Sequence, residues 1–219
     1  MTTGDGSAGG LGGLRRLATP KPPSAPKPPP QERCEMCGVA IADEHGHVAD
    51  TQDHRLLCVC RPCYLLFSAD GAGGARFRGV GTTVRVVDDL VLGEQDWSAL
   101  QIPVELAFFF SQGDPPTYAA FYPGPSGATE STLDLSSWQD VLAANAALAA
   151  VQPDVEAVLL RHHDPGFTCY VTPVDVCYEL VGIVRQHWVG LAGGAEVWDR
   201  IDAFFDGLAH RGVPTSRAG

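Results

Sequence analysis

The stretch LLCVCRPCYLLF, residues 56–67, contains three cysteines within six positions. A second stretch, RCEMCG at residues 33–38, contains two more. Each stretch includes a C-x2-C pair, and 22 residues separate the two pairs. Two thiolates at this spacing can bind one ion, and two such pairs are typical of a four-cysteine metal site. We therefore predict four metal ligands: Cys34, Cys37, Cys60 and Cys63.

The sequence between the two cysteine pairs predicts a β-hairpin. Residues 47–59, HVADTQDHRLLCV, alternate apolar and polar side chains around the turn DTQD. Pro62 suits the first position of a helix, so the second cysteine pair lies where a short helix begins. We predict that residues 33–67 form a treble-clef-like or zinc-ribbon-like module. Zinc is the predicted metal because Tyr64, rather than the glycine of a rubredoxin-type turn, follows the second pair. Iron is the alternative, since thiolates bind both metals.

Cys58 is the cysteine that this assignment leaves out. It lies two residues before Cys60, so the two side chains would face the same way on an extended strand. We interpret Cys58 as a small buried residue, with two alternatives: it replaces Cys60 as a ligand, or it is a resolving thiol beside a labile site. The same hairpin region contains three histidines, for which we expect solvated positions rather than a second site: His45, His47 and His54.

Residues 100–210 contain the same order of elements twice. Two strands, IPVELAFFF and TYAAFYP, precede a helix at SSWQDVLAANAALAAV, and two more, DVEAVLLRHH and FTCYVTP, precede a helix at VDVCYELVGIVRQHW. An Asp-Pro turn joins the strands in each half. We predict an α+β domain of the form ββα-ββα, with helices covering one face of a mostly antiparallel sheet. Thr172 and Pro173 are expected at the N-cap and the first position of the second helix.

The other segments of the 219-residue chain are expected to be less regular. Residues 1–32 are rich in glycine and then in proline, which predicts a disordered leader that cannot form a core. We expect residues 68–99 to be a linker with short strands and residues 211–219 to be a disordered tail.

The distribution of charge argues against a nucleic-acid ligand. The net charge is −11, yet residues 1–30 contain four basic residues and one acidic residue. The remainder therefore carries 11 basic and 25 acidic residues. Such a surface repels a phosphate backbone.

Neither a membrane span nor a secretory signal is predicted. The densest apolar run, IPVELAFFF, is much shorter than the ~18 residues of a membrane-spanning helix and is interrupted by Glu105. The N-terminus lacks the basic and apolar regions of a signal peptide, so we expect a cytoplasmic protein. Clustered cysteines in a reducing compartment more often bind metal or perform redox chemistry than form structural disulfides.

Several motifs together resemble a known family: RCEMCG, LLCVCRPCYLLF, LQIPVELAFFF, FYPGPSGATES, PDVEAVLL, TPVDVCYELVG and HWVGLAGGAEVW. The chain looks like a member of an uncharacterised actinobacterial family, a domain of unknown function encoded beside genes of uptake nickel–iron hydrogenases. The resemblance spans about residues 32–210. It implies a hydrogenase subunit or maturation factor as the partner, and it implies no catalytic residues.

These observations predict a non-catalytic accessory protein in which the four cysteines hold a structural zinc ion. The first alternative is a rubredoxin-like electron carrier that holds iron and serves the hydrogenase. The second is an enzyme of unknown reaction, although the spacing of the residues indicates neither a Ser-His-Asp triad nor a pair of catalytic carboxylates.

Overall fold

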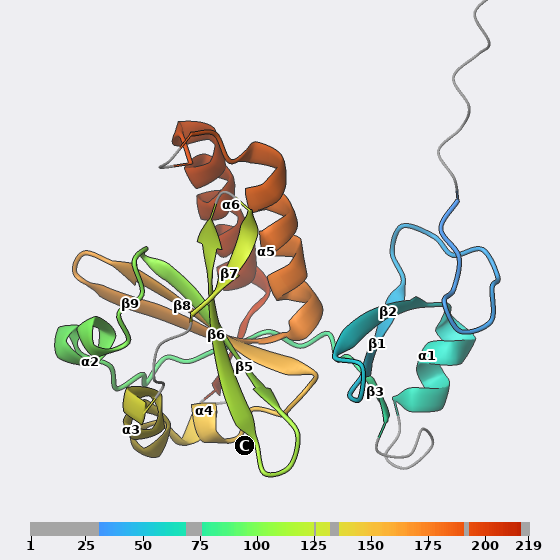
Figure 1. Ribbon diagram of the computed structural model, residues 1–219, viewed down its shortest axis with the longest axis horizontal. Coiled ribbons are helices and arrows are strands. Elements are labelled where there is room, and N and C mark those ends of the chain that lie inside the picture. The colour runs from blue at the N-terminus through green and yellow to red at the C-terminus, as the bar shows by residue number, and fades with distance from the viewer. Residues whose placement is uncertain (1–30, 69–75, 125, 132–135, 191–192, 216–219) are drawn as a thin grey trace, which may run out of the picture. The chain divides into compact units, whose positions relative to one another are not determined.

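The computed structural model describes residues 31–68, 76–124, 126–131, 136–190 and 193–215. The described residues from 32 onward belong to one compact unit. The described residues of this unit build a three-stranded sheet and a seven-stranded sheet, together with helices (Figure 1). The α+β class and the mostly antiparallel sheet are therefore as predicted. Residues 1–30 of the predicted leader and residues 216–219 of the predicted tail lie outside the described residues.

The cysteine-rich region contains the three-stranded sheet, in the order β2-β1-β3, and one helix. The elements are β1 (Gly46–Asp50), β2 (Arg55–Val59), α1 (Arg61–Phe67) and β3 (Phe77–Gly79). The β1–β2 hairpin turns where the sequence predicted, and its residues alternate between two faces. One face buries Val48, Leu57 and Val59 in a core that also contains Cys34 and Cys63.

The seven-stranded sheet has the order β10-β4-β9-β8-β5-β6-β7. Its centre consists of the two hairpins predicted from the repeat, which pair through their first strands, with Phe108 opposite Leu159. Every neighbouring pair is antiparallel except β10 and β4. The strands are β4 (Arg85–Val86), β5 (Leu106–Gln112), β6 (Thr117–Gly124), β7 (Gly127–Glu130), β8 (Glu156–His163), β9 (Gly166–Pro173) and β10 (Val213–Pro214).

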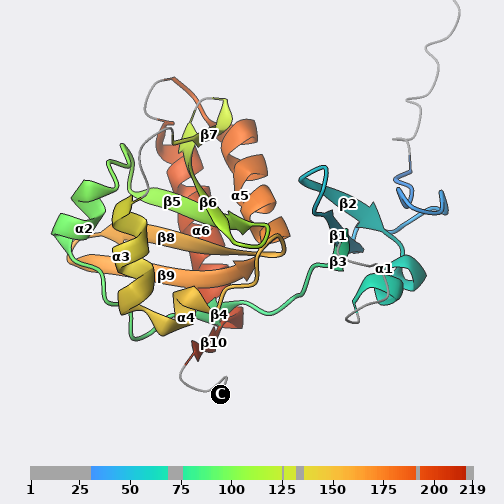
Figure 2. The ribbon, with the colours of Figure 1, turned by 60° about the horizontal axis from the view of Figure 1, so that its bottom comes forward.

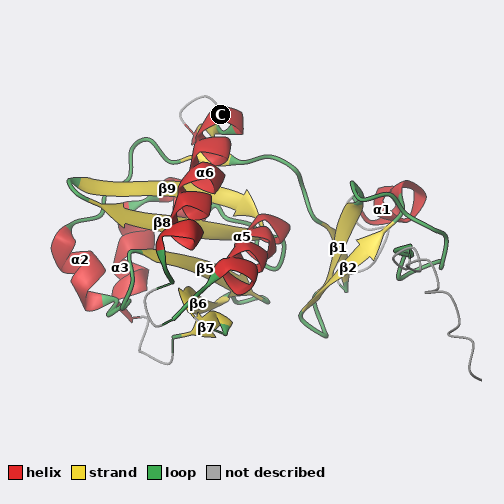
Figure 3. Ribbon diagram, turned by 90° about the horizontal axis from the view of Figure 1, so that it is seen from above, coloured by secondary structure: helices red, strands yellow, loops and turns green. Residues whose placement is uncertain are grey.

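Helices cover both faces of this sheet, so the expectation of a single covered face was wrong (Figure 2 and Figure 3). Leu106 and Phe108 of β5 pack with α5 (Val174–His187) and α6 (Ala195–Arg211). The intervening Ala107 and Phe109 face α2 (Glu94–Ala99), α3 (Ser136–Ala144) and α4 (Ala146–Ala149). The physical reason lies in the strand sequences. LAFFF in β5 and AVLL in β8 are continuous apolar runs, and such runs are typical of strands buried on both sides.

Three elements outside the predicted 100–210 domain belong to this sheet or cover it. β4 and α2 come from the predicted linker 68–99, and β10 comes from the predicted tail 211–219. The start of α5 also differs from the prediction. Thr172 and Pro173 are paired with β8 as the end of β9, so Pro173 is the N-cap and Thr172 is a buried strand residue. Strand pairing therefore extends two residues further than the local helix signal indicated.

Candidate metal centre

The first cysteine pair lies in a tight turn that precedes β1. The backbone N–H of Gly38 donates to the carbonyl of Cys34 at 2.8 Å, and the N–H of Cys34 donates to the carbonyl of Val39 at 2.8 Å. Gly38 has a φ of +75°, a conformation in which glycine lacks the steric penalty of other residues. This turn brings the side chains of Cys34 and Cys37 to the same side.

The second pair lies at the start of α1. Cys60 is the N-cap residue, and Cys63 is the buried residue of the helix. Pro62 is the second helical residue, where its missing N–H costs no intrahelical hydrogen bond. The 3.6-residue helical period then turns the side chain of Cys63 toward the first pair.

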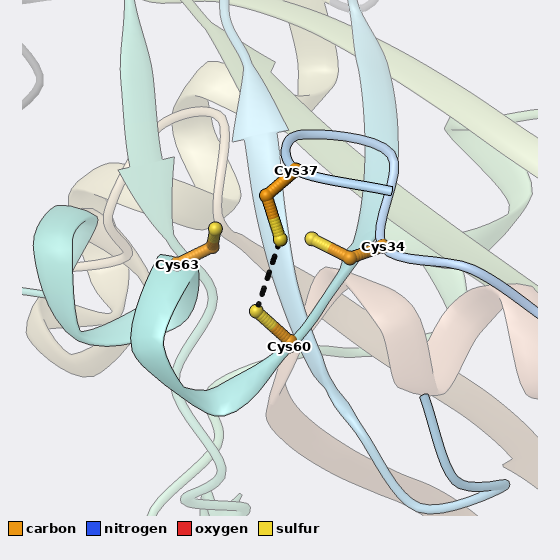
Figure 4. A group of neighbouring side chains, drawn as sticks. All are labelled: Cys34, Cys37, Cys60 and Cys63. Atoms are coloured by element: carbon orange, nitrogen blue, oxygen red, sulfur yellow. Dashed lines mark hydrogen bonds between the residues drawn. The ribbon is translucent and has the colours of Figure 1, made fainter. Parts of the chain in front are cut away.

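The four sulfur atoms lie around one point (Figure 4). All four Sγ atoms are within 4.8 Å of one another, and those of Cys37 and Cys60 are 3.6 Å apart. Four sulfurs that bind zinc at ~2.3 Å in a tetrahedron would be about 3.8 Å apart, close to the 3.6 Å contact. A disulfide needs a sulfur–sulfur bond of ~2.05 Å, and all seven cysteines are free thiols. The donor set therefore fits a metal ion that prefers soft ligands.

Burial and hydrogen bonding separate the pKa values of these thiols. Burial raises the pKa of Cys34, but backbone N–H groups, including those of Cys60 and Cys37, outweigh it and bring the pKa down to about 6. Burial and contact with the other three thiols raise the pKa of Cys63 to about 12. The N–H of Val39 lowers the pKa of Cys37, yet the thiols of Cys34 and Cys60 raise it by more. A divalent cation would favour ionisation of all four thiols.

The structure brings together the four cysteines that the spacing selected and leaves Cys58 out of the group. Cys58 belongs to β2 and lies directly opposite His47 of β1. Its pKa is raised by burial first and then by the nearby carboxylates of Glu35 and Glu32. The interpretation of Cys58 as a buried residue was wrong, because Cys58 is only half-buried. Its sulfur joins a second group of donor atoms with His45 and His47.

Sequence reasoning missed this second group, because the pairing register of the hairpin creates it. The H-x-H spacing of His45 and His47 was a weak local signal, since residues two apart on a strand face the same side. Nothing local indicates that Cys58 lies across from them. His54, the third histidine of the region, is in the turn with a φ of 48° and is not a member of the group.

The two remaining cysteines are core residues of the seven-stranded sheet region. Burial raises the pKa of both Cys169 and Cys177, and each is about 1% exposed. A thiol in such surroundings is unreactive toward metals and oxidants in solution. The metal-binding potential of the described residues is therefore concentrated in the cysteine-rich region.

The fold and the site define an α+β protein with a four-cysteine group that could hold a metal ion. The chain belongs to DUF5947, a family of unknown function whose profile matches residues 33–212. No curated protein and no solved structure is significantly similar to it. None of the helices in the described part of the chain has the length and apolar character needed to cross a membrane.

Proposed function

We propose that the four cysteines hold a structural zinc ion and that the protein is a non-catalytic accessory partner of a nickel–iron hydrogenase. The observation that carries the zinc site is the convergence of four Sγ atoms within 4.8 Å from two separate segments. A closed set of four thiolates leaves no coordination position for a substrate, which is typical of structural zinc. The nature of the partner rests on the family resemblance alone.

The order of elements in the cysteine-rich region supports a treble-clef fold for this module. A turn with two cysteines is followed by a hairpin, and the second pair lies at the N-terminus of a helix. A rubredoxin-type site would need a second tight turn in place of α1. Zinc is therefore favoured over iron.

The surface of the module supports a role in docking. Leu65 and Leu66 of α1 are 52% and 58% exposed, and Val39 beside the first cysteine pair is 50% exposed. Exposed large apolar side chains on so small a module are candidates for a protein–protein contact. The zinc ion would fix the position of α1 and of the turn that carries Val39.

Copurification with hydrogenase subunits tests the docking proposal. We expect the double variant Leu65→Glu/Leu66→Glu to lose the partner while it retains the metal, because neither side chain is a ligand. Val189→Glu is the matched control, since Val189 is 72% exposed and lies outside the module. Equal recovery of the partner with all three proteins would contradict the proposal.

A rubredoxin-like electron carrier is the second candidate, and the exposure of Cys37 favours it. A sulfur ligand at the surface would shorten the path for an electron between the metal and a partner. The visible absorption spectrum of the protein purified without oxygen separates the candidates. A red, reversibly reducible sample would establish iron, whereas a colourless sample with one tightly held zinc supports the structural site.

A further inference from the structure

Three side chains on the β1–β2 hairpin, or directly before it, form a second group of metal-ligand type. His47 and Cys58 are directly opposite each other in the pairing register, so their side chains project from the same face. His45 lies two residues before His47, and the centroids of the two imidazole rings are 4.9 Å apart. One donor atom of each residue lies within 4.8 Å of the other two. None of the three is a member of the four-cysteine group.

Each histidine has one ring nitrogen fixed by an acceptor, which leaves the other as the atom that can bind a metal. Nδ1 of His45 lies 2.9 Å from the carbonyl oxygen of Ala42, so Nδ1 is the donor and Nε2 holds the lone pair. This Nε2 atom is buried and has no hydrogen-bond partner in the structure. A buried polar atom without a partner is rare and unfavourable, and a metal ion would provide the missing interaction.

His47 shows the arrangement that commonly supports a metal-bound histidine. Its Nδ1 lies 2.8 Å from Oδ2 of Asp175, in the first turn of α5. A carboxylate at this position fixes the tautomer and the orientation of the ring and makes Nε2 a better ligand. Asp175 is thus a positioning residue, and Nε2 of His47 is free to bind.

We infer that Nε2 of His45, Nε2 of His47 and Sγ of Cys58 form a second, three-ligand site for a divalent zinc-type cation. Two imidazoles and one thiolate suit zinc or cobalt and do not suit calcium or magnesium, which prefer oxygen ligands. Three protein ligands leave a fourth position for water or a small anionic ligand, as in exchangeable rather than closed zinc sites. The site is independent of the identity of the metal in the four-cysteine group.

A neighbouring cavity gives such a fourth ligand a path to the site. The cavity has a volume of about 460 Å³, and its walls include His45, His47 and Asp175. Tyr64 and Cys60 line the same cavity, so the space also borders the four-cysteine group. An ion at the proposed site would be accessible to small ligands, whereas Cys34 and Cys63 are buried.

Titration of the metal-free full-length chain with Co²⁺ under anaerobic conditions tests this inference. We expect wild type to bind two equivalents, and Cys58→Ser and His47→Gln to bind one each, with the tighter equivalent retained. His54→Asn is the matched control and should bind two, because His54 is in the same hairpin but outside the group. One equivalent in wild type that Cys58→Ser retains, or two equivalents in Cys58→Ser, would overturn the second site.

Two further variants keep the result interpretable. Asp175→Asn should lower the Co²⁺ affinity of the second site ~10–100-fold and leave the affinity of the four-cysteine site unchanged, as expected for a positioning residue. An equal loss at both equivalents would show a structural effect and contradict the assignment. Cys34→Ser/Cys37→Ser should remove the tighter equivalent and also weaken the other, because the four-cysteine site stabilises the hairpin that carries His47 and Cys58. Retention of the tighter equivalent would contradict the proposed structural zinc site without affecting the second site.

Discussion

Replacement of one ligand, Cys60→Ser, should unfold the cysteine-rich module while the seven-stranded sheet remains intact. The module has a small core in which four aliphatic side chains are at most 6% exposed: Ile41, Val48, Leu57 and Val59. Burial of these side chains contributes about 1.5–3 kcal/mol each, or about 6–12 kcal/mol together. A structural zinc contributes about 10–16 kcal/mol of apparent binding free energy in a small domain. The metal is therefore at least as important as the core.

The size of the effect follows from the geometry of the site. Loss of an outer-shell partner alone costs up to ~100-fold in metal affinity, so loss of one of four direct ligands should cost more than ~100-fold. This factor corresponds to more than about 2.7 kcal/mol. The β1–β2 hairpin lies between the two cysteine pairs and joins them. The amide protons of its strands should therefore lose protection from exchange by at least the same factor.

Hydrogen exchange followed by mass spectrometry measures this effect directly. The amides of β1 and β2 should exchange more than ~100-fold faster in Cys60→Ser than in wild type, and those of β5 and β8 should not change. His54→Asn is the control, because His54 lies in the hairpin turn and outside both groups of ligand atoms. Unchanged protection of the hairpin in Cys60→Ser, or equal losses in His54→Asn and Cys60→Ser, would contradict this expectation.

Three other substitutions test the remaining structure. Trp138→Ala should lower the free energy of unfolding in urea by about 3–5 kcal/mol, because Trp138 is fully buried and stacks on Phe109 at 3.8 Å; a loss below about 1 kcal/mol would contradict this packing. Asn145→Ala should lower the free energy of unfolding by about 2–4 kcal/mol in the same assay, because the buried side-chain amide accepts a hydrogen bond from the N–H of Val91 and donates one to its carbonyl. A neutral effect would argue against that contact. The hydrogen bond from Arg76 holds the pKa of Asp50 down to about 2, against 3.8 for a free carboxyl group, so its stabilisation should be present above pH ~4 and disappear as the pH falls toward 2. Asp50→Asn should therefore make the free energy of unfolding less dependent on pH in this range, and an unchanged slope would be inconsistent with the pair.

The four-cysteine group could be predicted from the sequence because its geometry is set locally. A C-x2-C spacing determines the separation of two thiols within one turn, and the glycine after Cys37 indicates how that turn closes. Only the meeting of the two pairs depends on the tertiary structure. The predicted hairpin accounts for this meeting, because it reverses the chain and brings the second cysteine pair back beside the first.

The parts that sequence reasoning missed depend on contacts between distant residues. The group of His45, His47 and Cys58 depends on the pairing register of β1 and β2. Asp175, which fixes the ring of His47, lies 128 residues after that histidine in the sequence. The two-residue strand β10 has too few residues for a detectable pattern, and only its pairing with β4 defines it, whereas β4 lies in the linker for which short strands were predicted. The second helical layer was missed because a continuous apolar strand was interpreted as if one of its faces were open to solvent.

Native mass spectrometry of the full-length chain, purified without oxygen or chelators, tests the central claim most directly. We compare wild type with Cys34→Ser/Cys63→Ser, which removes the two buried ligands of the four-cysteine group. We expect wild type to carry at least one metal ion more than the variant, with the mass of zinc. Equal metal content in the two proteins would contradict the claim that these four cysteines hold a metal.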